Sequence, residues 1–286
     1  SIVIQGPIVN RDFIQGTINW YKSCGVKEVI VSTNDLVDNF KNAKTVVSDK
    51  SKIIGLGNEN NHIITTSNAL KLINDNNLVL KTRSDQRIYN ELALSAIPYI
   101  HNSHSSKFTK DGKKLGVISN NSMLLKINNL SDHLYIGNAK QMKLMFSLPF
   151  RNAEKTFEEL SLDDSYFDRR EDGTWLLYST KDTCRYTEFY GEQLLFNSFR
   201  RLCLKENLSE NRILDPINYL EGLRKYLEII KNCIYVVDPE ELDLYWIKSN
   251  IYTLPSFYHN KFQNNNPIPC MRLTRLNWLS LLSDPE

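Results

Sequence analysis

The stretch Asn77-Leu-Val-Leu-Lys-Thr-Arg-Ser-Asp-Gln-Arg-Ile88 decides which fold the sequence predicts. It opens with Leu78-Val-Leu80, a short apolar run that is typical of a strand buried on both faces. The residues that follow carry the charged side chains Lys81, Arg83, Asp85 and Arg87. A strand that ends in charge brings these groups to the carboxyl edge of a sheet, where open α/β sheets bind ligands. One carboxylate among several cations could bind a divalent metal together with a diphosphate. The alternative interpretation is that these residues form a solvent-exposed turn in which they pair with one another.

The residues before this stretch predict strands and helices in alternation. Further strands are expected at residues 1–9, 27–34 and 44–49. A helix capped by Asn10 or Asp12 follows the first strand and ends at Gly25. Apolar spacing predicts a second helix over residues 66–73, after a polar loop over residues 50–61. This alternation indicates an α/β fold with a mostly parallel central sheet flanked by helices.

Three predicted strand ends meet at one edge of that sheet. They are Gln5-Gly6-Pro7, Ser32-Thr33-Asn34 and Arg83-Ser84-Asp85. Their convergence indicates a nucleotide-type site more strongly than any one motif does. The sequence contains neither of the glycine-rich phosphate loops of dinucleotide-binding and P-loop proteins, which argues against those two classes.

The second half of the chain predicts mixed elements with weaker patterns. Strands are expected at residues 115–119, 123–127 and 233–237, and helices at residues 90–100, 139–146 and 188–204. Residues 131–138 are expected to lead into the helix at 139, and Asp215-Pro216 to open another helix. His101 and His104 fall in a polar segment, where solvated side chains are expected rather than metal ligands. An aromatic-rich segment surrounds His259 and suits either a core or sugar rings.

Composition bounds the classes of protein that the chain can belong to. Of its 286 residues 41% are hydrophobic and 24% charged, as in ordinary soluble proteins, and the net charge of +2 gives no argument for nucleic acid. The five cysteines include no CxxC pair, so neither a zinc site nor a disulfide scaffold is predicted. No apolar run is long enough to span a membrane, and no signal-peptide pattern opens the chain. We expect a cytoplasmic location, with peripheral association at the inner face of the cytoplasmic membrane left open.

Four blocks of the sequence resemble the WavE-type glycosyltransferases of polysaccharide synthesis. They are Ile2-Val-Ile-Gln-Gly-Pro-Ile8, Lys81-Thr-Arg-Ser-Asp-Gln86, Asp132 with Tyr135-Ile-Gly137, and Gly191-Glu-Gln193. The blocks occur in the family's order, and one departure is Asn61-His62, where the family tends to carry Arg-Gln. The resemblance implies a GT-A-like fold in a single domain over residues 1–286. Residues 1–130 would form its nucleotide-sugar-binding half and residues 131–286 a helical, aromatic acceptor-binding half.

The resemblance also implies an activity, namely transfer of a sugar from a nucleotide-sugar donor to a glycan or lipid-linked glycan of a bacterial lipopolysaccharide or capsule. The implied donor contacts are Gln5, Gly6, Pro7, Thr33, Asn34, Lys81, Arg83, Asp85 and Arg87. GT-A enzymes hold a divalent metal with an Asp-x-Asp motif, and Ser84-Asp85-Gln86 takes its place here with one carboxylate. Mg²⁺ or Mn²⁺ would then be held by Asp85 and a late histidine, His259, unless the nearby cations neutralise the diphosphate instead. If the reaction inverts the anomeric centre, the general base is expected to be Glu192, with Asp132 as second candidate.

Two other functions stay open from the sequence. A nucleotidyltransferase of sugar-nucleotide metabolism would share the sheet and the metal chemistry, but Gly6-Pro7 is a poor substitute for its basic glycine-rich loop. A non-catalytic glycan-binding protein would use the aromatic side chains without turning over a nucleotide sugar. The oligomeric state is left undetermined by the sequence.

Overall fold

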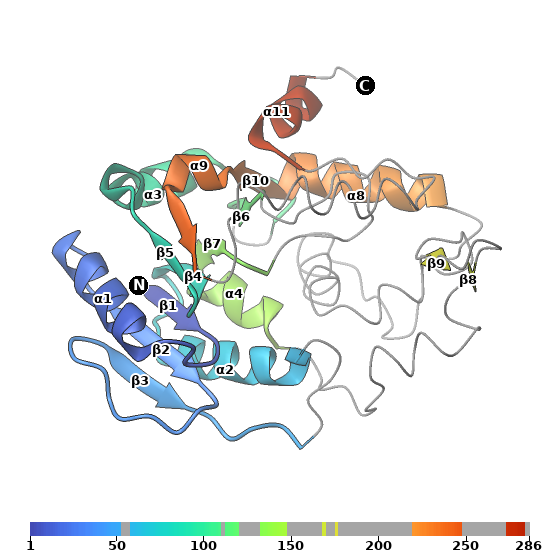
Figure 1. The fold of residues 1–286 in the computed structure, drawn as a ribbon. Helices are drawn as coiled ribbons and strands as arrows, with labels where there is room; N and C mark the ends of the chain where they lie inside the picture. The colour runs from blue at the N-terminus through green and yellow to red at the C-terminus, as the bar shows by residue number, and fades with distance from the viewer. Residues whose placement is uncertain are drawn as a thin grey trace.

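The fold is given by a computed structural model (Figure 1). It describes residues 1–52, 58–109, 112–119, 132–147, 168–169, 175–176, 219–247 and 273–283. Within these ranges no helix has the length and apolar character needed to cross a membrane.

A seven-stranded sheet forms the centre of the described part, with the strand order β10-β6-β7-β4-β1-β2-β3. All neighbouring strands pair in parallel except at β7, which is antiparallel to both β4 and β6. The prediction of a mostly parallel central sheet is therefore confirmed. The strands are β1 (Ile2–Gln5), β2 (Val29–Thr33), β3 (Lys44–Val47), β4 (Leu78–Arg83), β6 (Leu115–Ile118), β7 (Tyr135–Asn138) and β10 (Ile234–Val237).

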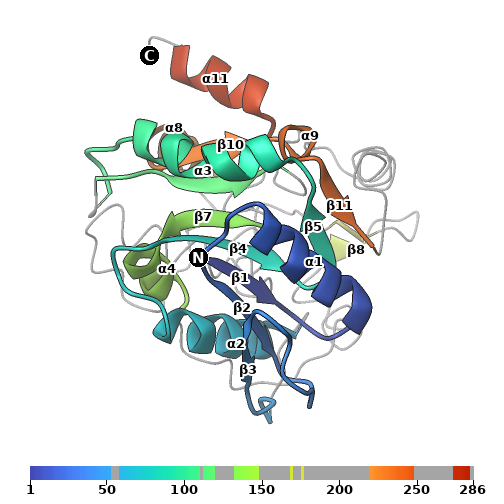
Figure 2. The ribbon, with the colours of Figure 1, turned by 90° about the vertical axis from the view of Figure 1, so that its left-hand side faces the viewer.

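Helices cover both faces of this sheet. α1 (Arg11–Ser23) connects β1 to β2, and α2 (Glu59–Lys71) connects β3 back to β4 on the other side of β1. Because parallel crossovers are right-handed, the reversal of direction places these two helices on opposite faces, as Figure 2 shows. α4 (Ala139–Met145) packs beside α2, whereas α8 (Tyr219–Cys233) and α11 (Arg275–Ser283) pack at β10.

Two small sheets stand outside the central one. β5 (Gln86–Ile88) pairs antiparallel with β11 (Leu244–Trp246), which follows the short helix α9 (Pro239–Leu242). β8 (Asp168–Arg169) pairs with β9 (Trp175–Leu176). The two-stranded β5–β11 ribbon begins directly after Asp85, and the Ile247 amide donates to the Asp85 carbonyl at 2.9 Å. The ribbon thereby forms a wall next to the end of β4.

The core is apolar along whole strands, as parallel strands covered on both faces require. Every residue of β1, β2, β6 and β10 is buried. β7 and β10 come from the predicted acceptor half, yet both belong to the same sheet as the strands of the predicted donor half. One continuous sheet therefore carries residues from both predicted halves.

Several predicted boundaries were wrong. α2 begins at Glu59, inside the predicted polar loop, and residues 135–138 form strand β7 rather than a lead-in to α4. α3 (Glu91–Ser103) is capped by Asn90 as predicted, but it continues past Pro98, so that His101 is a buried helix residue. His104 stacks on the Tyr235 ring at 4.7 Å, and the expectation of a solvated loop fails for both histidines. The strand predicted at 123–127 and the helix predicted at 188–204 lie outside the described residues.

Candidate active site

The carboxyl edge of the central sheet gathers the predicted strand ends. Gln5 at the end of β1 is in register with Ser32 of β2 and with Arg83 of β4. β7 runs in the opposite direction, so it begins at the same edge, where Asp132 and His133 lie three and two residues before it. The side chains at the three predicted strand ends are thus joined at this edge by Asp132 and His133, which precede an antiparallel strand.

The turn after β1 is fixed by contacts that exclude a larger residue at Gly6. Its φ of 136° is strongly unfavourable for an L side chain, and a Cβ would lie 2.6 Å from the Ser84 Oγ. The Gly6 amide donates to Ser32 O at 3.1 Å, and Ser84 Oγ donates to Pro7 O at 2.7 Å. The Gly6-Pro7 turn is therefore held directly against the Ser84-Asp85 turn.

The remaining residues predicted at the ends of β1 and β2 shape the edge through internal contacts. Gln5 donates to Thr65 Oγ1 at 3.1 Å, and the Asn34 side chain donates to the carbonyl groups of Ser48 and Asp49. Thr33 is fully buried, and its Oγ1 accepts from the Asp35 amide at 3.1 Å. These side chains hold neighbouring loops together; contact of these residues with a donor stays a prediction.

Arg83 stands between two carboxylates at this edge. Its guanidinium donates from Nε and Nη2 to the two oxygens of Asp85 at 3.1 and 3.3 Å, and its Nη1 lies 3.5 Å from Asp132 Oδ2. The Asp85 side chain is only 2% exposed, whereas those of Asp132 and Arg83 are 18% and 26% exposed. A planar fork that binds one carboxylate with two parallel bonds is strongly oriented. Asp85 therefore holds Arg83 in place, and Arg83 and Asp132 form the accessible part of the cluster.

The two other predicted cations have different surroundings. Lys81 is fully buried in β4, and its Nζ donates to the backbone oxygen of Asp132. Arg87 does not join the cluster: its guanidinium donates to Thr17 Oγ1, Phe13 O and the Tyr89 hydroxyl at 2.8–2.9 Å. Strand alternation in β5 explains this, since Gln86 and Ile88 face the interior while Arg87 faces α1. The structure brings Lys81, Arg83, Asp85 and Asp132 together and leaves Arg87 apart.

Two histidines that were not among the predicted site residues flank Asp132, and one of them, His62, belongs to the Asn61-His62 departure from the WavE-type pattern. His62 Nδ1 of α2 lies 3.9 Å from Asp132 Oδ2, and His133 Nε2 lies 3.9 Å from Asp132 Oδ1. The Gln86 side-chain nitrogen lies 2.7 Å from His133 Nδ1. If the amide donates there, the proton of the neutral ring is on Nε2, which is also the tautomer that the nearby Asp132 charge favours. Gln86 and Asp132 thus orient His133 from opposite sides, with the Trp246 ring packed edge-on against it at 4.7 Å.

Burial and charge set the protonation of this cluster. Burial, reinforced by the Lys81 charge, lowers the pKa of His62 to about 3. Burial also lowers the pKa of His133 to about 4, although the Asp132 charge opposes this. Burial acts to raise the pKa of Asp132, but the charges of Arg83 and Lys81 outweigh it and hold that pKa well below the usual range. At neutral pH the cluster therefore contains an ionised Asp132 between two uncharged imidazoles.

The described residues do not make a complete site for a divalent cation. This part of the chain contains no group of three or more histidine, cysteine, aspartate or glutamate side chains that could hold a metal ion. Both Asp85 oxygens accept from Arg83, and both imidazoles face Asp132 beside two positive charges. The second predicted metal ligand, His259, and the predicted base, Glu192, lie outside the described residues. Both assignments stay predictions.

Comparisons with known proteins find only weak structural similarity to two solved structures described here. No protein-family model matches the chain, and no curated protein matches it in sequence. A 4-diphosphocytidyl-2C-methyl-D-erythritol synthase from Anaerococcus prevotii DSM 20548 aligns with 10% identity over 66% of this chain and 97% of its own, at a TM-score of 0.33. The galactosyltransferase LgtC, in complex with donor and acceptor sugar analogs, aligns with 9% identity over 79% of this chain and 96% of its own, at a TM-score of 0.30. At such scores neither neighbour identifies a reaction for this chain, and the WavE-type resemblance stays a prediction.

Proposed function

We propose that this protein is a glycosyltransferase that takes its sugar from a nucleotide-sugar donor and transfers it to a bacterial surface glycan. The observation that carries the proposal is the gathering of Gly6-Pro7, Arg83, Asp85 and Asp132 at the carboxyl edge of the parallel strands. That edge is where open α/β sheets bind nucleotides. The order of the WavE-like blocks adds the sugar-transfer chemistry to this general nucleotide-binding position.

Arg83 is the residue that we assign to the donor diphosphate. Its guanidinium is partly accessible and is oriented by Asp85, and a planar fork of donors suits phosphate oxygens. Negative charge grows on the diphosphate as the glycosidic bond breaks, so a preorganised cation at that point would favour the transition state. No step of this proposal passes through a metal ion; metal dependence is a separate prediction.

The protonation of Asp132 separates the two candidate bases. Asp132, whose pKa is held below the usual carboxylate range, accepts a proton less readily than an ordinary carboxylate does, because the efficiency of a general base depends on its pKa. We therefore keep Glu192 as the proposed base and assign to Asp132 the role of orienting Arg83 and the two histidines. This changes the role of Asp132 from proton acceptor to a fixed negative charge in the site.

The test is a panel of nucleotide sugars assayed for release of the nucleotide product, first with the unmodified protein and then with Arg83→Gln. Removing one preorganised donor from a transition-state charge is expected to lower kcat by at least about 100-fold. Arg11→Gln is the matched control, since Arg11 is an exposed arginine of α1 that donates to the carbonyl groups of Asp38 and Asn39. It should retain full activity.

Three outcomes would count against the proposal. Pyrophosphate release from a nucleoside triphosphate would indicate a nucleotidyltransferase. Glycan binding without any thermal stabilisation by nucleotides would indicate a binding protein, because a ligand of the native state raises its melting temperature. An Arg83→Gln variant that folds and keeps its turnover would remove the proposed role of the cluster.

A further inference from the structure

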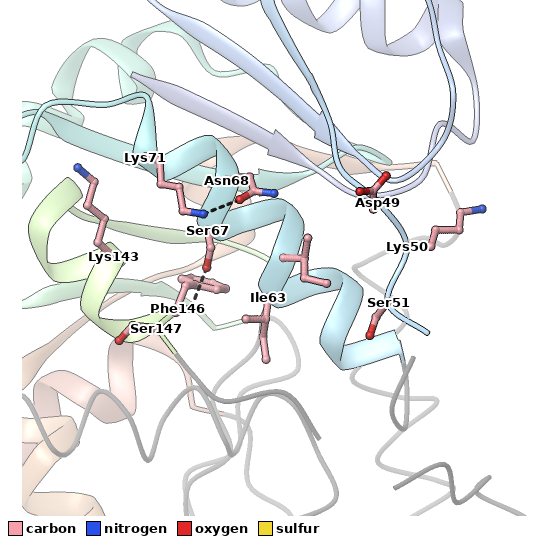
Figure 3. A pocket seen from close by; sticks show the side chains of 11 residues that line it. Asp49, Lys50, Ser51, Ile63, Ser67, Asn68, Lys71, Lys143, Phe146 and Ser147 are labelled. Carbon is pink, nitrogen blue, oxygen red and sulfur yellow. Dashed lines mark hydrogen bonds between the residues drawn. The ribbon is translucent and has the colours of Figure 1, made fainter. Parts of the chain in front are cut away.

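The groove beside α2 and α4 gives a ligand little to bind (Figure 3). Ile63 and Phe146, which line it, are only 3% and 1% exposed, so they offer almost no apolar surface. Lys143 Nζ donates to Asp75 Oδ1 at 2.6 Å and to Ile73 O at 2.7 Å. The groove therefore has neither an accessible apolar floor nor an oriented pair of cations. A charge without such a carboxylate partner is found on the opposite face of the sheet, beside α1.

Arg87 lies between the β5–β11 ribbon and α1, which stand side by side in Figure 2. Its guanidinium donates from Nε to Thr17 Oγ1 at 2.9 Å and from Nη2 to Phe13 O at 2.8 Å. A third bond runs from Nη1 to the Tyr89 hydroxyl at 2.9 Å. All three acceptors are uncharged, and in the part of the chain that the structure describes Arg87 has no ion-pair partner. Its positive charge is therefore not neutralised by a carboxylate of this part of the protein.

The solvent side of this guanidinium carries unused donors. A guanidinium has five N–H groups, of which the three bonds to the protein use three. The Nη2 side is enclosed, because a Cβ at Gly16 of α1 would lie 2.9 Å from Nη2, whereas the bond from Nη1 to Tyr89 is exposed. The Tyr89 hydroxyl accepts that bond and keeps its own O–H as a donor. Arg87 Nη1 and Tyr89 Oη therefore form a pair of neighbouring donors at the surface.

Aromatic rings surround this pair of donors. The Arg87 Cζ lies 4.5 Å from the centre of the Phe13 ring and 5.2 Å from that of the Tyr89 ring. Tyr245 of β11 is directly opposite Arg87 in the ribbon, and its ring centre lies 5.9 Å from that of Phe13 and 6.2 Å from that of Tyr89. Tyr89 and Tyr245 are 39% and 47% exposed. Because these two rings are not covered by the core, they offer apolar surface to the C–H groups of a sugar ring.

We propose that Arg87, Tyr89 and Tyr245 bind an acidic sugar residue of a glycan. Its carboxylate would accept from Arg87 Nη1 and Tyr89 Oη, and its ring would lie against Tyr245. The choice of a sugar as the carrier of the carboxylate rests on the proposed function, in which the acceptor is a glycan. Neighbouring residues of a strand face opposite sides, so Trp246 packs on His133 at the candidate active site while Tyr245 faces α1. The proposed site is thus behind the wall of the active site and would hold the glycan away from the reacting group.

The experiment measures binding of acidic oligosaccharides to the intact protein by isothermal titration calorimetry. Trigalacturonate, a heparosan tetrasaccharide and a trimer of sialic acid carry the carboxylate on three different sugar rings. At least one of them should bind at least about tenfold more tightly than its carboxyl-reduced, neutral counterpart, because reduction removes a charge-assisted hydrogen bond. Triglutamate provides carboxylates without sugar rings and should bind more weakly than the best acidic sugar. The proposal is overturned if none of the three binds or if triglutamate binds as tightly as they do.

Variants locate the site with the probe that binds best. Arg87→Gln should weaken it at least about tenfold. Tyr89→Phe removes only the hydroxyl, and Tyr245→Ala removes an exposed ring without touching the bonds of Arg87 to α1; each should weaken the probe several-fold. Arg224→Gln and Tyr99→Ala are the matched controls, since they remove an exposed arginine of α8 and an exposed tyrosine of α3, and both should bind like the unmodified protein. Unchanged binding by Tyr89→Phe and Tyr245→Ala, or equal loss in the controls, refutes the site.

Binding at Arg87 and turnover of a nucleotide sugar can fail separately. A protein that binds an acidic sugar through Arg87 but releases no nucleotide keeps this site and loses the proposed function. A protein that turns over a nucleotide sugar but binds none of the acidic probes keeps the proposed function and loses this site.

Discussion

Replacing His62 by Phe should remove part of the acid sensitivity of this protein. In the unfolded chain the imidazole has its ordinary pKa of 6.5, whereas burial lowers the pKa of the folded His62 to about 3. At pH 5 the unfolded state therefore carries nearly one proton at this side chain, whereas the folded state carries almost none. Stability rises with pH wherever the unfolded state binds more protons, so it decreases here as the pH is lowered. The stability contributed by the neutral ring is thus complete above pH 6.5 and decreases as the pH drops toward 3.

The size of the effect follows from the same two pKa values. A full proton of difference changes the free energy of unfolding by about 1.4 kcal/mol per pH unit, and the change from pH 7 to pH 5 integrates to about 2 kcal/mol. The unmodified protein should therefore lose about 2 kcal/mol more over this interval than His62→Phe does. The His62 side chain is only 13% exposed, so solvent screening reduces this value little.

The assay is urea unfolding at pH 7, 6 and 5 for both proteins, with Phe146→Leu as the control. That control alters the ring packed against His62 but carries no titrating group, so its stability should change with pH in parallel with the unmodified protein. If the curves of His62→Phe and of the unmodified protein are also parallel, His62 is protonated in the folded state. The description of the cluster as an anion between neutral rings would then be wrong.

Three further measurements address the same edge of the sheet. Arg83→Met should lower the free energy of unfolding by about 3 kcal/mol, because it removes the guanidinium that binds the buried Asp85 carboxylate. A shift of the urea midpoint equivalent to less than about 1 kcal/mol would contradict this. Gly6→Ala should lower the free energy of unfolding by about 2 kcal/mol, because the new Cβ must adopt a positive φ and contacts Ser84 Oγ. In a Ser84→Ala background the loss should be smaller, and thermal melts would show this partial recovery. If Asp85 and His259 hold Mg²⁺ or Mn²⁺, EDTA should abolish nucleotide-sugar turnover and Mn²⁺ should restore it; turnover that is insensitive to EDTA would reject the metal prediction.

The local sequence was sufficient to predict the parallel part of the sheet. Strands β1, β2 and β4 are uninterrupted apolar runs followed by small or charged residues, so both their burial and the edge at which they end can be read from the chain. β7 could not be recognised in this way. It contains four residues directly before a helix, and its identity as a strand depends on pairing with both β4 and β6.

The candidate site was predictable only in part, for related reasons. Arg83 and Asp85 belong to the strand end itself, and they lie together as expected. Arg87 lies apart because the chain enters a different sheet after Asp85, which changes the direction of the alternating side chains. His133 directly follows Asp132 in the sequence, but no local pattern marks this pair as part of a site. His62 comes from α2, and no pattern within that helix indicates Asp132 as a neighbour; the packing of α2 in the folded chain brings the two side chains together.

The β5–β11 ribbon has a consequence for the time at which the candidate site is completed during synthesis. Beside the ribbon, the Asn90 side chain donates to the Glu241 carbonyl, 151 positions further along the chain. A loop of that length closes slowly, and the earlier strands leave the ribosome long before Trp246 does. A nascent chain can thus assemble β1 to β4 before the Trp246 ring packs against Arg83 and His133. The candidate site should therefore be complete only after most of the polypeptide has emerged, well after the first half of the sheet has formed.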